Sequence, residues 1–125
     1  MNLSVGPMCR IVLLVRDFAK SLAFYRDVLG LEPQGPIYDG WAVLKTGGPS
    51  LCLRGPWPGM PFSAEKFGSS PDEILFRVSS AEETRRRLIE RGVAVKEIHS
   101  PGPGIRVAEF ADPDGRRLGV ESSTI

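Results

Sequence analysis

The sequence predicts an α+β fold built from two tandem copies of one βαβββ module. Three observations predict it. A strand pattern that runs straight into a helix occurs twice, once from Arg10 and again from Glu73. A pair of strands joined by a tight turn also occurs twice, in the same order. A stretch rich in proline and glycine separates the two halves. Self-similarity at this separation is the mark of a duplicated structural unit. A single strand–helix match is common in any α+β protein, but two matches in the same order favour duplication.

The first strand of each module lies at residues 10–16 and 73–79. Each holds isoleucine, a hydrophobic pair and valine at equivalent places, which favours a strand. Side chains alternate along a strand, so Ile11, Leu13 and Val15 should face the helix that follows. The opposite face then carries Arg10, Val12, Leu14 and Arg16 in the first copy, and Glu73, Leu75 and Arg77 in the second.

A helix follows each of these strands. Asp17 can cap a first helix that runs to about Leu29, and Gly30 suits the left-handed position after it. The apolar stripe of this helix consists of Phe18, Leu22, Tyr25 and Leu29. In the second copy Ser80 and Glu83 have the spacing of a capping box, and Gly92 ends the helix. The basic run at 85–87 is expected on the solvated face of that helix.

The remaining strands complete each module. Residues 41–46 and 105–110 read as strands, followed by turns at 46–49 and 112–115 whose Asp, Pro and Gly residues favour a chain reversal. The last strands, 48–53 and 115–120, also match, with a few extra residues in the second copy that we place in a loop. Short segments near 31–34 and 93–98 are expected as second strands.

The linker is too long and too rich in aromatic residues for a free solvated tail. Trp57, Met60, Phe62 and Phe67 should cover something apolar: a sheet edge, a ligand cavity or a second subunit. We therefore expect a single domain over 1–125, with module one at about 8–55, the linker at about 56–71 and module two at about 72–123.

Bulk properties limit the partners and the location. A formal net charge of +1 gives no sign of a nucleic acid or membrane partner. No apolar run reaches the roughly 20 residues of a membrane span, and the first residues lack the pattern of a signal peptide. Cys9 and Cys52 lack metal-type or redox-type spacing. We expect reduced thiols and a cytoplasmic protein.

Two motifs resemble those of the glyoxalase/bleomycin-resistance/dioxygenase family, also called the vicinal oxygen chelate family. Residues 15–31 are similar to its first-module motif, a strand, an aspartate and a helix that contains Phe-Tyr and closes in Leu-Gly. Residues 110–115 resemble the turn before its last strand. The resemblance implies that the two modules form a U-shaped open barrel with helices on the convex face and the ligand on the concave face. It also implies a homodimer.

Metal-dependent members of this family place one ligand on the first strand and one on the last strand of each module. The equivalent positions here hold Arg10, Cys52, Glu73 and Gly119. Arginine stays protonated and glycine has no side chain, so this set does not form a divalent metal site. Glu121 lies two residues beyond Gly119 and could replace the missing carboxylate, but Arg10 would still repel the ion. His99 is off the ligand positions and is expected at the surface. We expect neither a metal nor another cofactor.

Without metal, the concave face should hold a small organic ligand, aromatic or anionic, by apolar burial and a few charges. The candidate ligand-binding residues are Arg10, Val12, Leu14, Trp41, Cys52, Arg54, Trp57, Glu73, Leu75, Arg77 and Glu121. The arginines either clamp an anionic group or simply pair as Arg10–Glu73 and Arg77–Glu121.

Three functions stay open. The first is metal-free sequestration, with Trp41, Trp57, Phe62 and Phe67 as stacking surfaces. The second is acid–base catalysis by Glu73 or Glu121, which a raised carboxyl pKa would mark. The third is a metal-dependent lyase, isomerase or dioxygenase whose ligands lie elsewhere.

Overall fold

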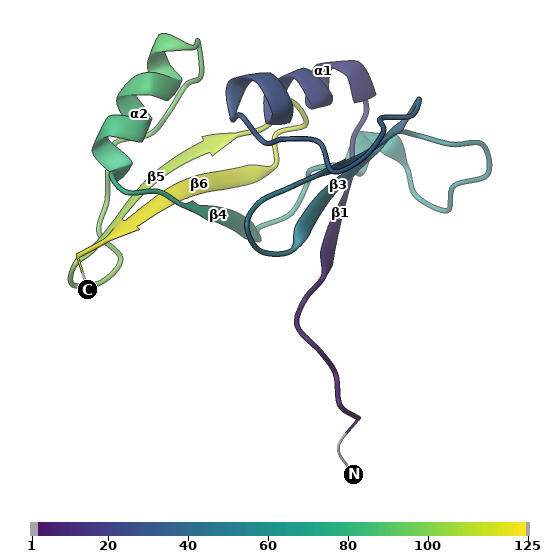
Figure 1. The fold of residues 1–125 in the computed structure, drawn as a ribbon. Coiled ribbons are helices and arrows are strands. Elements are labelled where there is room, and N and C mark those ends of the chain that lie inside the picture. Colours follow the sequence, from purple (N-terminus) through teal and green to yellow (C-terminus); the bar gives the residue numbers. More distant parts are fainter. Residues whose placement is uncertain (1–2, 125) are drawn as a thin grey trace. The chain divides into compact units, whose positions relative to one another are not determined.

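The structure is a computed structural model that describes residues 3–124. The chain divides into two compact units, unit 1 ending at Glu65 and unit 2 beginning at Lys66, and each is described by itself (Figure 1). Both have the same order of elements, a strand, a helix and two further strands. This repeated α+β architecture confirms the predicted fold class and the duplication.

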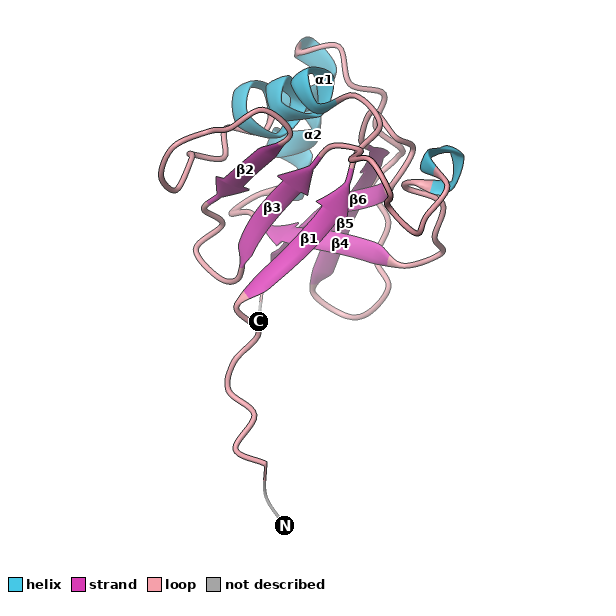
Figure 2. Ribbon diagram, turned by 90° about the vertical axis from the view of Figure 1, so that its right-hand side faces the viewer, coloured by secondary structure: helices cyan, strands magenta, loops and turns pink. Residues whose placement is uncertain are grey.

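Unit 1 contains a three-stranded sheet with β3 (Ser50–Arg54) in the centre. Strand β1 (Arg10–Leu14) pairs with β3 in parallel, and β2 (Trp41–Leu44) pairs with it antiparallel (Figure 2). The core residues of this unit include Leu13, Val15, Leu22, Tyr25, Ala42, Leu44, Leu51 and Leu53, all buried. The predicted inward row of the first strand is confirmed at Leu13 and Val15, while Val12 is 47% exposed.

The first helix begins where predicted but changes its type. Asp17 caps α1 (Phe18–Leu22) by accepting a hydrogen bond from the backbone N–H of Lys20 at 3.1 Å. The chain then continues as a π-helix, η1 (Ala23–Val28), in which the Leu29 N–H donates to the carbonyl of Phe24. Such wider turns are rare and do not follow from residue propensities. The π turn places Tyr25 in the core with no exposed surface.

Unit 2 repeats the arrangement, with β6 (Arg117–Ser123) between β4 (Glu73–Arg77) and β5 (Ile105–Ala111). Strand β4 is parallel to β6 and β5 is antiparallel to it. Helix α2 (Ala81–Glu90) lies over β5 and β6. The buried residues of this unit include Ala81, Leu88, Val107, Ala108, Phe110, Leu118 and Val120.

The repeat read from the sequence is also the repeat of the structure. Strands β1 and β4 begin at Arg10 and Glu73, the two positions that the sequence match pairs. Helices α1 and α2 begin at Phe18 and Ala81, which are separated by the same distance along the chain. The last strands begin at Ser50 and Arg117, slightly further apart, as the extra residues of the second copy require.

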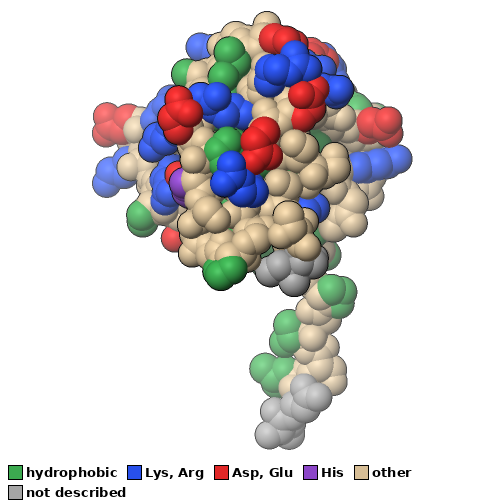
Figure 3. All heavy atoms as spheres, turned by 90° about the vertical axis from the view of Figure 1, so that its left-hand side faces the viewer, with side chains coloured by type: hydrophobic (Ala, Val, Ile, Leu, Met, Phe, Trp, Pro, Cys, Tyr) green, Lys and Arg blue, Asp and Glu red, His purple; other side chains and the backbone are tan. Residues whose placement is uncertain are grey.

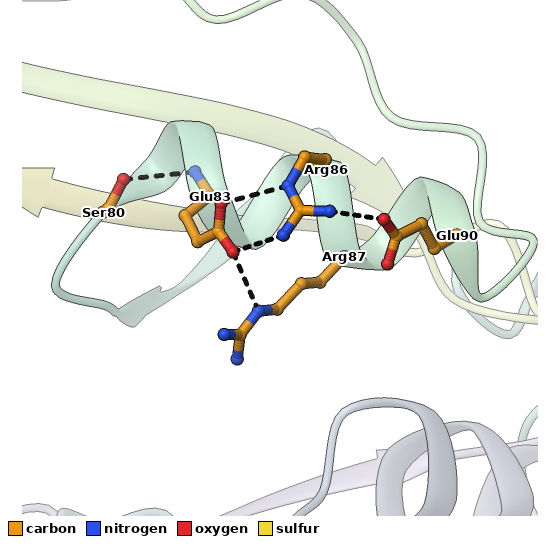
Figure 4. A network of polar contacts seen from close by, with 5 residues as sticks. All are labelled: Ser80, Glu83, Arg86, Arg87 and Glu90. Atoms are coloured by element: carbon orange, nitrogen blue, oxygen red, sulfur yellow. Dashed lines mark hydrogen bonds and ion pairs between the residues drawn. The ribbon is translucent and has the colours of Figure 1, made fainter.

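Helix α2 has the predicted cap, and the predicted solvated basic face is observed at Arg86 and Arg87. The Ser80 hydroxyl accepts a hydrogen bond from the N–H of Glu83 at 3.1 Å. The Glu83 carboxylate in turn pairs with Arg86 at 2.6 Å and Arg87 at 3.1 Å (Figure 4). Figure 3 shows positive and negative side chains interspersed over the face it presents. Arg86 and Arg87 therefore belong to intrahelical ion pairs, whereas Arg85 is half-buried and pairs with Glu97, outside the helix, at 3.4 Å.

The expected second strands of the modules do not form as regular strands. Residues 32–34 still pair with β2, since Gln34 N–H donates to the carbonyl of Val43 at 2.7 Å. In unit 2, His99 exchanges backbone hydrogen bonds with Val107 at 2.9 and 3.0 Å. Pro33 lies within the first segment and lacks the N–H group that a ladder needs, whereas residues 93–98 contain no proline.

The linker is partly fixed against its neighbours. It contains a short 3-10 helix, η2 (Ala64–Lys66). The Arg16 guanidinium, just after β1, donates to the carbonyls of Ala64 at 2.8 Å and Glu65 at 2.6 Å. Of the four large apolar side chains, Phe67 is buried, Trp57 and Met60 are half-buried, and Phe62 is 56% exposed. Phe62 therefore differs from the prediction that all four cover an apolar surface.

Candidate functional site

The predicted ligand-binding residues of unit 1 gather on one face of its sheet. The register places Val12 opposite Cys52 and Leu14 opposite Arg54, with Trp41 on the other side of Arg54. Because facing residues of paired strands share a side of the sheet, these residues form one surface. We call this surface the unit-1 face; it comprises Arg10, Val12, Leu14, Trp41, Val43, Cys52 and Arg54.

One end of the unit-1 face carries an aromatic–guanidinium stack. The Arg54 guanidinium lies 3.7 Å from the centre of the Trp57 ring. This geometry is a cation–π contact, which restricts the guanidinium while leaving its N–H edges able to donate. The backbone beside the stack is also fixed, because the Gly55 N–H donates to the Gly40 carbonyl at 2.9 Å. The arrangement offers a flat surface and an oriented cation.

Cys52, at the centre of this face, is buried and has no exposed surface. Burial raises the pKa of its thiol, although Arg10 and Arg54 pull in the opposite direction. A thiol held in its protonated form is a poor nucleophile and a poor metal ligand. Cys52 is therefore a small apolar residue of the sheet.

The predicted residues of unit 2 also share one face of its sheet. Leu75 lies opposite Gly119, and Arg77 lies opposite Glu121. The Arg77 guanidinium forms an ion pair with Glu121 at 3.1 Å, so the predicted local pairing of these two charges is observed. Arg77 is largely exposed, which makes the pair a weak contributor to stability.

Glu73 belongs to a cluster that sequence reasoning missed in part. Arg117 donates to Glu73 at 3.4 Å and to Glu109 at 2.8 Å. A hydrogen bond between the two carboxyl groups raises the pKa of Glu73, with burial as the next cause, and lowers the pKa of Glu109. Glu73 is thus the member that keeps a proton to higher pH.

Glu109 was not among the candidates from the sequence. The signal for it was the alternation along 105–110, which puts Glu109 opposite Gly119 and on the face of Glu73. His99 lies at the edge of this cluster, with Nε2 3.7 Å from Glu109 Oε1 and its side chain 45% exposed. The expected surface position of His99 is therefore observed.

The four metal-ligand positions of the family do not fit a metal here. At Gly119 a Cβ atom would lie 2.7 Å from Leu75 Cδ2 and 3.1 Å from the carbonyl oxygen of Ala108, so the neighbours occupy the space of a ligand side chain. Cys52 is a protonated thiol and Arg10 carries no lone pair. Over residues 3–124, no group of three or more His, Cys, Asp or Glu residues is arranged to hold a metal ion.

A family model for the glyoxalase/bleomycin resistance protein/dioxygenase superfamily matches residues 8–120. The chain therefore belongs to this superfamily, as its two motifs predicted. No curated protein matches the sequence.

Among solved structures, TnmS3, an antibiotic binding protein from Streptomyces sp. CB03234, is 27% identical, with a TM-score of 0.77 over 98% of this chain and 100% of that chain. A glyoxalase/bleomycin resistance protein/dioxygenase from Nocardioides is 21% identical, with a TM-score of 0.78 over 98% and 86% of the two chains. A lactoylglutathione lyase from Agrobacterium tumefaciens is 22% identical, with a TM-score of 0.73 over 95% of each. The last two likenesses establish the fold alone.

Among the residues that the structure describes, no helix has the length and apolar character needed to cross a membrane.

Proposed function

We propose that this protein binds a small organic molecule, aromatic or anionic, on the unit-1 face without a catalytic metal. The observation that carries the proposal is the Arg54–Trp57 stack at the end of an apolar row. A ligand ring would pack on Val12, Leu14 and the indole groups, while the oriented guanidinium would receive an anionic or carbonyl group. Burial of apolar ligand surface would supply most of the affinity.

Two further observations support this proposal. TnmS3 is an antibiotic binding protein, and it is 27% identical to this chain over nearly its whole length. The residues at the family's metal positions form no ligand set, which favours binding without metal-dependent chemistry. The proposal includes a homodimer in the cytoplasm, and sedimentation equilibrium measures the oligomeric state.

Tryptophan fluorescence tests the binding. Both tryptophans of the chain, Trp41 and Trp57, lie in unit 1, on the proposed surface or beside it. Titration with bleomycin and a panel of aromatic carboxylates should give saturable quenching with at least one compound. Val12→Lys places a charge on the apolar row and should abolish it. Ile89→Lys is the matched control, because Ile89 of α2 is 45% exposed and Val12 is 47% exposed. Equal quenching in both variants would overturn the assignment of the site.

The metal-free part of the proposal has its own measurement. Protein purified without chelator is analysed for divalent metals by inductively coupled plasma mass spectrometry. We expect substoichiometric metal. Stoichiometric zinc, iron, nickel or manganese would instead support a metal-dependent lyase, isomerase or dioxygenase.

Acid–base catalysis by Glu73 is a second candidate, favoured by the raised pKa of its carboxyl group. Groups with displaced pKa values in a polar cluster are typical of proton-transfer sites. Recovery of each quenching compound after incubation separates the two functions. Unchanged compound supports sequestration, whereas product that forms with wild type and not with Glu73→Gln supports catalysis.

A further inference from the structure

We infer that unit 2 holds a second binding site, for a small organic carboxylate, in a cavity beside strand β5. The cavity has a volume of about 440 Å³. Its lining consists of Ala94, Val95, Lys96, Glu109, Phe110, Ala111, Gly115, Arg117 and Leu118. All of these residues belong to unit 2, so the site is independent of the unit-1 face and of the function proposed for it.

The walls of the cavity are held by hydrogen bonds. The Lys96 N–H donates to the carbonyl of Glu109 at 2.9 Å, which joins the outer segment to β5. The Arg85 guanidinium of α2 donates to the carbonyls of Lys96 at 2.8 Å and Val95 at 3.4 Å. These bonds fix residues 95–96 on both sides, so the cavity is formed before a ligand binds. Binding therefore costs little free energy for ordering the protein.

The charges of the lining favour an anionic ligand. The Glu109 carboxylate already has partners for its charge, because Arg117 donates to it at 2.8 Å and His99 lies 3.7 Å away. The side chain of Lys96 is exposed, and none of the ion pairs among the described residues involves it. Its charge acts on Glu73 and Glu109 only through space, by lowering the pKa of each. The lining charge without a direct partner is therefore a cation, and a carboxylate would pair with it.

The rest of the lining is mostly apolar and suits the body of such a ligand. Ala94, Val95 and Ala111 line it together with the core residues Phe110 and Leu118. A volume of about 440 Å³ lies within the range of known small-molecule sites. An apolar wall and one available ammonium group suit a small aromatic or aliphatic monocarboxylate as the ligand.

Two-dimensional 15N–1H NMR of the full chain tests the inference, with benzoate, phenylacetate and hexanoate as probes. We expect at least one probe to give saturable shifts at the amides of 94–96, 109–111 and 115–118. Benzyl alcohol, of similar shape to benzoate but uncharged, should bind at least roughly tenfold more weakly, the factor that one charge-assisted hydrogen bond supplies.

Three variants locate the site. Lys96→Gln should weaken the binding roughly tenfold, and Ala94→Trp should fill the cavity and abolish it. Lys66→Gln, which removes an exposed lysine elsewhere in unit 2, should leave it unchanged. Absence of saturable shifts with all three probes would overturn the inference, and so would equal binding of benzyl alcohol or of the Lys96→Gln variant. Shifts confined to the unit-1 face would also overturn it while supporting the function proposed above.

Discussion

Gly68 provides a quantitative test of how the linker meets unit 2. Its backbone has φ of +81°, a conformation that costs an alanine roughly 1 kcal/mol or more. A Cβ atom there would also lie 2.6 Å from the carbonyl oxygen of Asp114 and 3.0 Å from its carbonyl carbon. Backbone atoms of a turn cannot move aside as the end of a side chain can, so overpacking adds about 1–3 kcal/mol. Gly68→Ala should therefore lower the free energy of unfolding by about 2–4 kcal/mol in total.

Gly92→Ala is the matched control for this prediction. Gly92 has φ of +86° but no atom within 4 Å of its added Cβ, so it carries the same backbone strain without the collision. It should cost only about 1 kcal/mol. Urea unfolding measures both losses, and an unchanged m-value verifies that the unfolding transition is the same. Losses that agree within about 0.5 kcal/mol would refute the close approach between Gly68 and the turn.

Three further predictions concern unit 2. Ser80→Ala removes the cap of α2 and should cost about 1 kcal/mol in urea unfolding, whereas Ser79→Ala, one residue outside the cap, should cost little. Gly119→Ala should cost about 1 kcal/mol by the same measurement, because the new Cβ would lie 3.1 Å from the carbonyl oxygen of Ala108. A variant as stable as wild type, or more stable, would contradict the packing at this position. The raised pKa of Glu73 means that its contribution to stability is present below its unfolded value of about 4.5 and is lost as pH rises through its folded value. The stability of wild type relative to Glu73→Gln should therefore fall as pH rises above about 4.5, and a difference that stays constant with pH would contradict the raised pKa.

Much of the fold follows from local patterns in the sequence. The repeat, both helix starts and the paired last strands depend on short-range signals, such as the caps at Asp17 and Ser80, and these are confirmed. The π turn around Tyr25 was not predictable, because its hydrogen-bond spacing leaves no distinct mark in the pattern of apolar residues. The short second strands also differ from prediction: Pro33 interrupts the ladder of the first, and the second, at 93–98, holds no proline and has no such explanation.

The candidate sites were predictable only where strand alternation determines them. Alternation correctly placed Val12 and Cys52 on one face of their sheet, and Arg77 and Glu121 on one face of theirs. For Glu73 it suggested Arg10 as the partner and missed Arg117 and Glu109, because the register of β4 on β6 places Arg117 opposite Glu73 and the register of β5 on β6 brings Glu109 to the same face. The cavity of unit 2 could not be predicted from the sequence either, because it depends on the path of an irregular segment that Arg85 holds in place.

The position of the last strand in each sheet bears on how the chain is made. Strands β3 and β6 are central in their sheets, yet each is the final strand of its module in sequence. During synthesis β1 has no strand to pair with until Ser50–Arg54 leaves the ribosome. In the same way β4 and β5 stay unpaired until Arg117–Ser123 has been made. Translation that stopped before Arg117 would leave two strands that share no hydrogen bonds. A stop codon just before Arg117 should therefore be as damaging to the sheet of unit 2 as one just before Glu73.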